Sequence, residues 1–266
     1  MNLRVEHRTT FTYDAPIAEA YTELRLRPLD VDGQRCFSHR LVTEPRGLRI
    51  HEFVDRLGNV VAHFDVLEPH QRLAVTAESE VHTAAFGDRT PPTPLELFDY
   101  LRPSDFALPD AAIGGLASAR AGAGGAADRA RALMEAVADE LVYERGATSV
   151  NTPAPDVLAL GRGVCQDFAH VLIAACRHEA IPARYVSGYL HDDAVADGHG
   201  ASHAWVDVWD DEAGWVSLDP THRREQDGSY VRVAVGRDYA DVPPTRGVFK
   251  GKAEEKLSVK VSVGVV

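Results

Sequence analysis

The segment GRGVCQDFAHVLIAACRHE at 161–179 carries most of the information about the fold. A glycine-rich turn at 161–163 introduces a run that is apolar around most of its circumference, which predicts a buried helix over 165–179. Cys165 then lies in the first turn of this helix, where unpaired backbone N–H groups and the helix dipole favour a thiolate and can bind an oxyanion. Cys165 is therefore a candidate nucleophile, whereas Cys176 lies in the apolar part of the helix and is expected to pack as a small hydrophobe.

Two later segments, SHAWVDVW at 202–209 and GWVSLDPTH at 214–222, supply a candidate base and a candidate acid. They predict two strands joined by a short turn, and if Trp209 faces Trp215, then His203 and Asp219 are diagonal neighbours on one face. A slip of one residue would send Asp219 to the other face. In the expected register, Cys165, His203 and Asp219 provide the nucleophile, base and orienting acid of a catalytic triad.

The rest of the chain divides into regions of different pattern. Residues 1–85 alternate between apolar and polar positions, with turn residues between the runs, which predicts an antiparallel β-sandwich-like domain. Residues 86–125 are rich in proline and glycine and predict a connecting region with at most short helices. Residues 126–266 place a striped helix and the buried helix before several strands, the last over 257–265, which is the order of an α+β domain.

Four motifs together resemble one known family. They are GRGVCQDFAH, AIPARYVSGYL at 180–190, SHAWVDVW and GWVSLDPTH, and they resemble the transglutaminase-like superfamily, a papain-related group of cysteine enzymes with the chain order Cys, His, Asp. The match runs from about Tyr143 to Pro244, and residues 236–244 and 1–85 resemble parts of the bacterial members.

The resemblance implies a papain-like α+β fold, in which the nucleophilic cysteine begins a helix that packs on an antiparallel sheet. It assigns Cys165 as nucleophile, His203 as base and Asp219 as orienting acid. Relatives also supply a side-chain oxyanion donor upstream of the cysteine, for which Tyr143 and Asn151 are the candidates.

Composition narrows the possible partners and the compartment. The net charge is −12 and no long basic run occurs, so nucleic acid is not an expected partner. No apolar stretch is long enough to span a membrane and the first residues contain no signal-like apolar region. Three cysteines are too few for a disulfide framework and predict reduced thiols in the cytoplasm.

No metal or organic cofactor is predicted. The His- and Asp-rich stretch HDDAVADGHGASH at 191–203 lacks the compact ligand pairs of zinc sites and predicts a solvated loop that shapes substrate access. A dinucleotide or phosphate-binding glycine loop is absent. Asp167 and His170 are expected to support the packing and hydrogen bonding of the buried helix. The three tryptophans are expected to lie in the core or in a pocket wall, and the oligomeric state is left open.

The expected reaction is acyl transfer through a thioester on Cys165, with a peptide or protein as substrate. Water as the acceptor gives a peptidase or amidase, which is slightly favoured. A primary amine as the acceptor gives a transglutaminase, which is the alternative. A non-catalytic binding module on the same fold is the alternative from another class, and the complete triad disfavours it.

Overall fold

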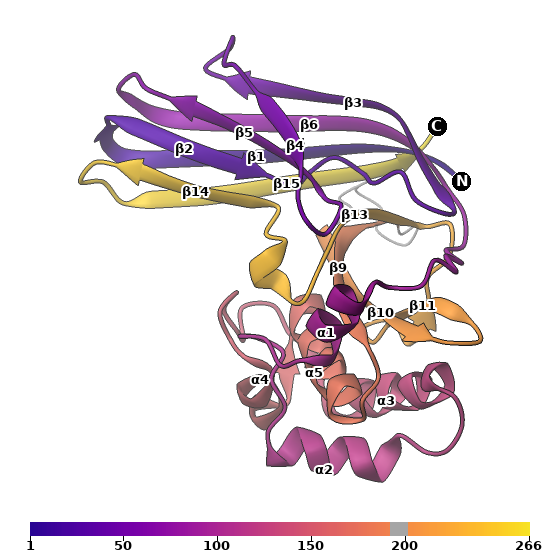
Figure 1. The fold of residues 1–266 in the computed structure, drawn as a ribbon. Coiled ribbons are helices and arrows are strands. Elements are labelled where there is room, and N and C mark those ends of the chain that lie inside the picture. Colours follow the sequence, from indigo (N-terminus) through magenta and orange to yellow (C-terminus); the bar gives the residue numbers. More distant parts are fainter. Residues whose placement is uncertain (192–201) are drawn as a thin grey trace.

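A computed structural model describes residues 1–191 and 202–266 of the chain. Figure 1 shows a stack of long strands lying over a smaller sheet with its helices. The neighbouring strands of these sheets are antiparallel, so the protein has the α+β architecture that the sequence predicts. None of the helices within the described ranges combines the length and apolarity needed to cross a membrane.

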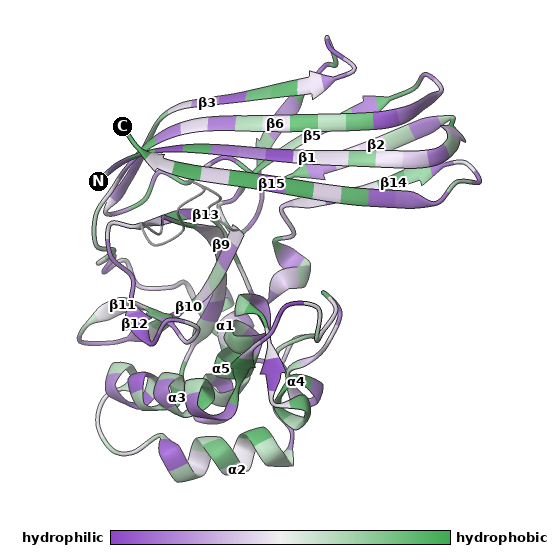
Figure 2. Cartoon of the chain, turned by 180° about the vertical axis from the view of Figure 1, so that it is seen from behind, coloured by the Kyte–Doolittle hydropathy of each residue, from purple (hydrophilic) through white to green (hydrophobic). Residues whose placement is uncertain are grey.

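The long strands form a sandwich of two sheets. One sheet has the order β15-β1-β6-β3 and the other has the order β14-β2-β5-β4. Along β1 alternate side chains are buried, as the period of two predicts, and the hydropathy colours of Figure 2 alternate along the same strands. The strands are β1 (Asn2–Ile17), β2 (Glu19–Leu24), β3 (Gln34–Glu44), β4 (His51–Val54), β5 (Val60–Val66), β6 (His70–Thr83), β14 (Thr245–Lys250) and β15 (Glu255–Val265).

The end of the chain belongs to this sandwich. The sequence predicted a strand over 257–265 and assigned it, within residues 126–266, to the catalytic domain. The strand is present, but it pairs with β1 from Leu3↔Val265 to Tyr13↔Glu255, and β14 pairs with β2. Alternation predicts that a segment is a strand and carries no information about its partner, so the pairing of the two chain ends was missed.

The second part is built around α5, which packs against β9 and β10 and is surrounded by α2, α3 and α4. Its main sheet has the order β12-β11-β10-β9-β13, and β7 and β8 form a separate parallel pair. The helices are α1 (Pro94–Leu101), α2 (Ala111–Arg120), α3 (Ala126–Glu140), α4 (Ala154–Leu160) and α5 (Cys165–His178), with a 3₁₀ turn at Tyr239–Asp241. The strands are β7 (Val142–Tyr143), β8 (Arg162–Gly163), β9 (Ala183–Leu190), β10 (Ser202–Asp210), β11 (Gly214–Asp219), β12 (Arg224–Glu225) and β13 (Tyr230–Gly236).

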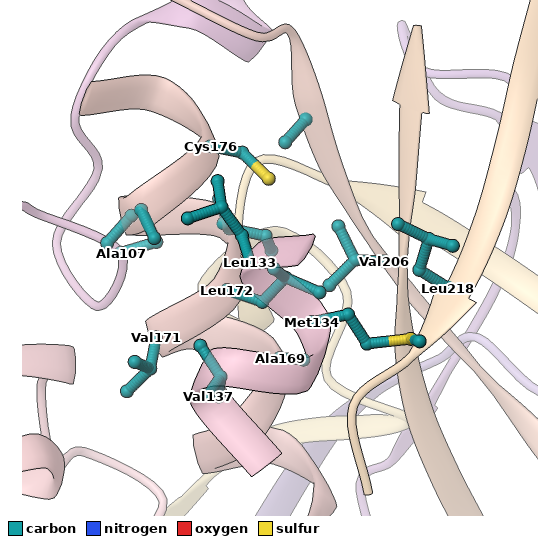
Figure 3. Close-up of a cluster of buried hydrophobic side chains, with 14 of the residues drawn as sticks. Ala107, Leu133, Met134, Val137, Ala169, Val171, Leu172, Cys176, Val206 and Leu218 are labelled. Atoms are coloured by element: carbon teal, nitrogen blue, oxygen red, sulfur yellow. The ribbon is translucent and has the colours of Figure 1, made fainter. Parts of the chain in front are cut away.

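Helix α5 is buried along almost its whole length, as its composition predicts. Figure 3 shows Leu133 of α3 beside Leu172 and Cys176 of α5, with Val206 of the sheet on the other side. These side chains are fully buried. The helix is therefore fixed in position from all sides, and its N-terminus, which carries Cys165, is held with it.

Candidate active site

Cys165 is the first residue of α5, and the turn before it is held by Asp167. The Asp167 carboxylate accepts a hydrogen bond from the Val164 backbone N–H at 2.7 Å and another from the Thr148 hydroxyl at 2.6 Å. Burial raises the pKa of Asp167, and these two hydrogen bonds oppose the rise. A Cβ on Gly163 would lie 2.5 Å from a carboxylate oxygen of Asp167, so only glycine fits there. The glycine turn thus allows the contact that caps the helix and places Cys165.

The hairpin of β10 and β11 has the register that the sequence predicts. Trp209 pairs with Trp215 and Val206 with Leu218, which puts His203 and Asp219 on one face. The His203 Nε2 donates to an Asp219 carboxylate oxygen at 2.7 Å, and both side chains are buried. Since Nε2 is engaged, Nδ1 is the ring nitrogen left for the thiol.

Asp219 accepts more hydrogen bonds than the sequence suggested. The oxygen that accepts from His203 also accepts from His222 Nδ1 at 2.8 Å and from the Tyr230 hydroxyl at 2.6 Å. The other oxygen accepts from the backbone N–H of Thr221 at 2.9 Å. Burial raises the pKa of Asp219, but the hydrogen bonds from His203, His222 and Tyr230 outweigh it, so the pKa lies well below its usual range. Asp219 is thus held as a carboxylate.

His203 is held in its charged form. Burial lowers the pKa of His203, but hydrogen bonds with Asp219 and with Cys165 act in the opposite direction and raise it from 6.5 to about 10. The structure therefore brings Cys165, His203 and Asp219 together in the order of a triad.

Cys165 and His203 help to line a cavity of about 670 Å³. The oxyanion candidate Tyr143 lines it too, whereas Asn151 is exposed and is not among its lining residues. The first backbone hydrogen bonds of α5 run from the N–H groups of Asp167 and Phe168 to the Val164 carbonyl, so the N–H groups of Cys165 and Gln166 are further candidate oxyanion donors.

Sequence reasoning missed several lining residues. Arg145 lies close enough to Tyr143 and Cys165 for both residues to raise the pKa of its guanidinium. Tyr185, Tyr239 and Lys260 are among the other lining residues that were missed. A basic residue two positions after Tyr143 was a visible signal for Arg145, whereas Lys260 could not be found because the partner of its strand was unknown.

One group of side chains in the described part of the chain could hold a metal ion. Ligand atoms of His203, Asp219 and His222 lie within 4.8 Å of one another. Zinc ligands lie about 2.0–2.2 Å from the metal, and the same Asp219 oxygen already accepts from both imidazoles. A metal there would displace the hydrogen bond that orients His203, so the group fits the triad better than a metal site. The loop expected to shape substrate access, 191–203, falls largely on residues 192–201, which lie outside the described ranges.

The tryptophans and His170, which the sequence also singled out, are buried in the interior of the protein. Trp205, Trp209 and Trp215 are buried, and none of them lines the cavity. His170 is fully buried, and burial lowers its pKa to about 4. Its Nε2 accepts from the Tyr239 backbone N–H at 3.2 Å. All three cysteines are unpaired.

Comparison with known proteins gives the same picture as the geometry. The model of the transglutaminase-like superfamily matches residues 116–220, and that of the bacterial transglutaminase-like N-terminal region matches residues 3–82. An uncharacterized protein of Mycobacterium leprae is 35% identical over 98% of both chains. A protein-glutamine gamma-glutamyltransferase of Pseudomonas aeruginosa is 32% identical over 34% of this chain and 15% of its own length.

Among solved structures, a candidate cysteine protease from Cytophaga hutchinsonii shares the fold. Its TM-score is 0.80, with 22% identity, and the match covers 99% of this chain and 90% of that one. The relative and the structural neighbour span both parts of the molecule, the sandwich as well as the helical part. The chain therefore belongs to the transglutaminase-like superfamily and has its papain-like fold, preceded by the bacterial N-terminal β region.

Proposed function

We propose that this protein is a cysteine-dependent hydrolase of amide bonds in peptides or proteins. The observation that carries the proposal is the 2.7 Å hydrogen bond from His203 to Asp219 beside Cys165, at the start of a buried helix. Each group has the environment its role requires: a thiol at a helix N-terminus, an oriented imidazole and a buried carboxylate.

The reaction we propose proceeds through a thioester. The Cys165 sulfur attacks the amide carbonyl carbon, and N–H groups at the start of α5 stabilise the oxyanion. The C–N bond breaks as the His203 imidazolium gives its proton to the leaving nitrogen. A water molecule then attacks the thioester, and His203 takes a proton from it. The C–S bond breaks, the acid is released, and the thiolate and imidazolium are restored.

Amine transfer is the second candidate function. It differs only in the second acceptor, because a primary amine would attack the thioester in place of water. The similarity of 100 residues to the Pseudomonas aeruginosa protein-glutamine gamma-glutamyltransferase favours this candidate. The three unpaired cysteines support a reducing compartment for either reaction, and we propose a cytosolic location.

Peptide libraries incubated with and without a labelled primary amine distinguish the candidates. Mass spectrometry should find cleaved or deamidated peptides for a hydrolase and amine-labelled peptides for a transferase. Cys165→Ser and His203→Ala should abolish product, whereas Cys176→Ser, which changes a buried thiol away from the cavity, should retain it. Absence of any product with the unmodified chain would support a non-catalytic binding module.

A further inference from the structure

The strand β15 is an edge strand of the sandwich. In its sheet it pairs with β1, and no described strand pairs with it on the other side. The register to β1 is continuous over residues 255–265. Edge strands offer unpaired N–H and C=O groups to any extended chain that lies beside them.

Hydrogen bonds identify which residues of β15 point outward. The N–H of Val266 donates to Asn2 at 3.0 Å, and that of Asp14 donates to Glu254 at 3.2 Å, so even-numbered residues bond to β1. Antiparallel pairs alternate in this way, and the odd-numbered residues must direct their backbone groups away from β1. The Val263 carbonyl, which accepts from the His191 ring at 3.3 Å, follows the rule.

The outward edge of β15 adjoins the cavity with Cys165. Val259, Lys260 and Val261 line the same cavity as Cys165 and His203. Val259 and Val261 are odd-numbered, so the backbone groups that they direct away from β1 belong to the strand segment that lines the cavity. The sandwich therefore supplies a wall of the candidate active site as a strand whose outward backbone groups at Val259 and Val261 pair with no other strand of the described residues.

The charge of the cavity lining differs from that of the whole chain. Among the described residues that line it, Arg145 and Lys260 are cationic, as is the protonated His203, and no aspartate or glutamate occurs, although the chain has 40 acidic residues and a net charge of −12. Lysines on edge strands also discourage pairing between copies, and Lys256 could serve that purpose equally. Of these two lysines only Lys260 lines the cavity, so its charge favours a ligand that carries an anionic group.

We infer that an acidic polypeptide segment binds in extended form along the outward edge of β15, with its backbone paired to Val259 and Val261. A carboxylate of the segment lies near Lys260 and Arg145, and a peptide bond of the same segment faces Cys165. The inference rests on the proposed function for its choice of a polypeptide and adds a recognition mode and a charge class.

Binding can be tested without chemistry in a Cys165→Ala background. The probes are two pools of short fluorescein-labelled peptides, matched except that one has Glu where the other has Gln. Fluorescence anisotropy should show tighter binding of the Glu pool. Lys260→Glu should bring the ratio of the two affinities close to one, whereas Lys256→Glu, a change on the same strand away from the cavity, should leave it unchanged.

The backbone part of the inference has its own pair of variants. Val259→Pro removes an outward N–H without removing a bond to β1 and should weaken binding about 3- to 10-fold, the worth of one hydrogen bond. Leu257→Pro is the matched control because it is also outward-facing but does not line the cavity, and it should bind normally. If Val259→Pro fails to fold, Glu peptides with N-methylated backbones should show the same loss with the unmodified strand.

Three outcomes would overturn the inference. They are equal binding of the two pools, unchanged binding of the edge variants and N-methylated peptides, or a dimer of the chain that Val259→Pro dissociates, since the edge would then pair with a second copy. Because Cys165→Ala forms no thioester, these outcomes do not depend on the proposed reaction. Amide-bond activity with no edge effect would contradict this inference alone.

Discussion

The Asp219 carboxylate is a hydrogen-bond acceptor that several side chains of the candidate site share. One oxygen of Asp219 accepts from His203, His222 and Tyr230, so its negative charge is shared among three donors. Asp219→Asn keeps an acceptor of similar size but removes the charge. The pKa of His203, about 10, should fall by about 1 to 3. NMR titration of the His203 ring measures this change, and an unaltered pKa would mean that Cys165 holds the imidazolium without help from Asp219.

The raised pKa of His203 also predicts how stability depends on pH. A pKa that is 6.5 in the unfolded chain and about 10 in the folded one means that the folded protein binds the proton more tightly. This contribution to the free energy of unfolding is complete below pH 6.5 and is lost as the pH rises through 10. Urea unfolding on both sides of this interval should show the excess stability of the wild type over Asp219→Asn shrinking with pH. An excess that grows with pH would contradict the assignment.

At the scale of elements, the turn before α5 depends on a close approach of glycine to a carboxylate. In Gly163→Ala the new Cβ would displace the Asp167 side chain and break its hydrogen bond to Val164. Loss of a helix cap costs about 0.5–2 kcal/mol, and Cys165 should lose its position as well. We expect a lower thermal midpoint and slower alkylation of Cys165.

Gly115 in α2 provides the matched control for that change. Nothing lies within 4 Å of a Cβ placed there, so Gly115→Ala should raise the free energy of unfolding by about 0.5–1 kcal/mol through helix propensity. Its Cys165 should be alkylated at the wild-type rate. Equal alkylation rates in the two variants would show that the contact of Gly163 with Asp167 does not position the thiol.

Elements with a strong repeating pattern of apolar residues could be predicted from the sequence, whereas elements with a short or weak pattern could not. The apolar run after Cys165 predicted α5, and the paired tryptophans predicted the register that joins His203 to Asp219. The two-residue strands β7 and β8 are too short to show a period of two. In β14, whose sequence is TRGVFK, a glycine weakens the strand pattern. The long-range partners of Asp219 and the partner of β15 depend on tertiary packing, which no local pattern carries.

At the scale of the molecule, the sandwich and the five-stranded sheet β12-β11-β10-β9-β13 share an apolar cluster. Leu3 and Val5 of β1 pack with Tyr189 and Val231 of the five-stranded sheet, and Val263 of β15 joins them. Sheet packing of this kind couples the two parts, since neither apolar face is covered without the other. We therefore expect the whole chain to unfold as one unit, although its sequence divides into regions with different patterns of apolar residues.

Side-chain amides from the first part add to this coupling along β13, an edge strand of the five-stranded sheet. Gln34 bonds to both backbone groups of Arg232, with distances of 2.7 and 2.8 Å. Asn59, which is fully buried, accepts from the Val235 N–H at 2.7 Å and donates to the Val235 carbonyl at 2.9 Å. The Asn59 amide thus satisfies backbone groups of Val235 that an edge strand would otherwise leave unpaired, whereas the Arg232 carbonyl also accepts from the Leu29 N–H at 3.0 Å.

Replacing Asn59 with leucine tests the unity of the fold. Asn59→Leu leaves the buried N–H and carbonyl of Val235 unpaired, and each such group costs about 1–3 kcal/mol, so the free energy of unfolding should fall by about 2–6 kcal/mol. Calorimetry should show one transition at a lower temperature. Asn151→Leu, at an exposed position, should change the free energy by less than about 0.5 kcal/mol. Two transitions, of which Asn59→Leu moves only one, would mean that the sandwich and the five-stranded sheet unfold independently despite their shared apolar cluster.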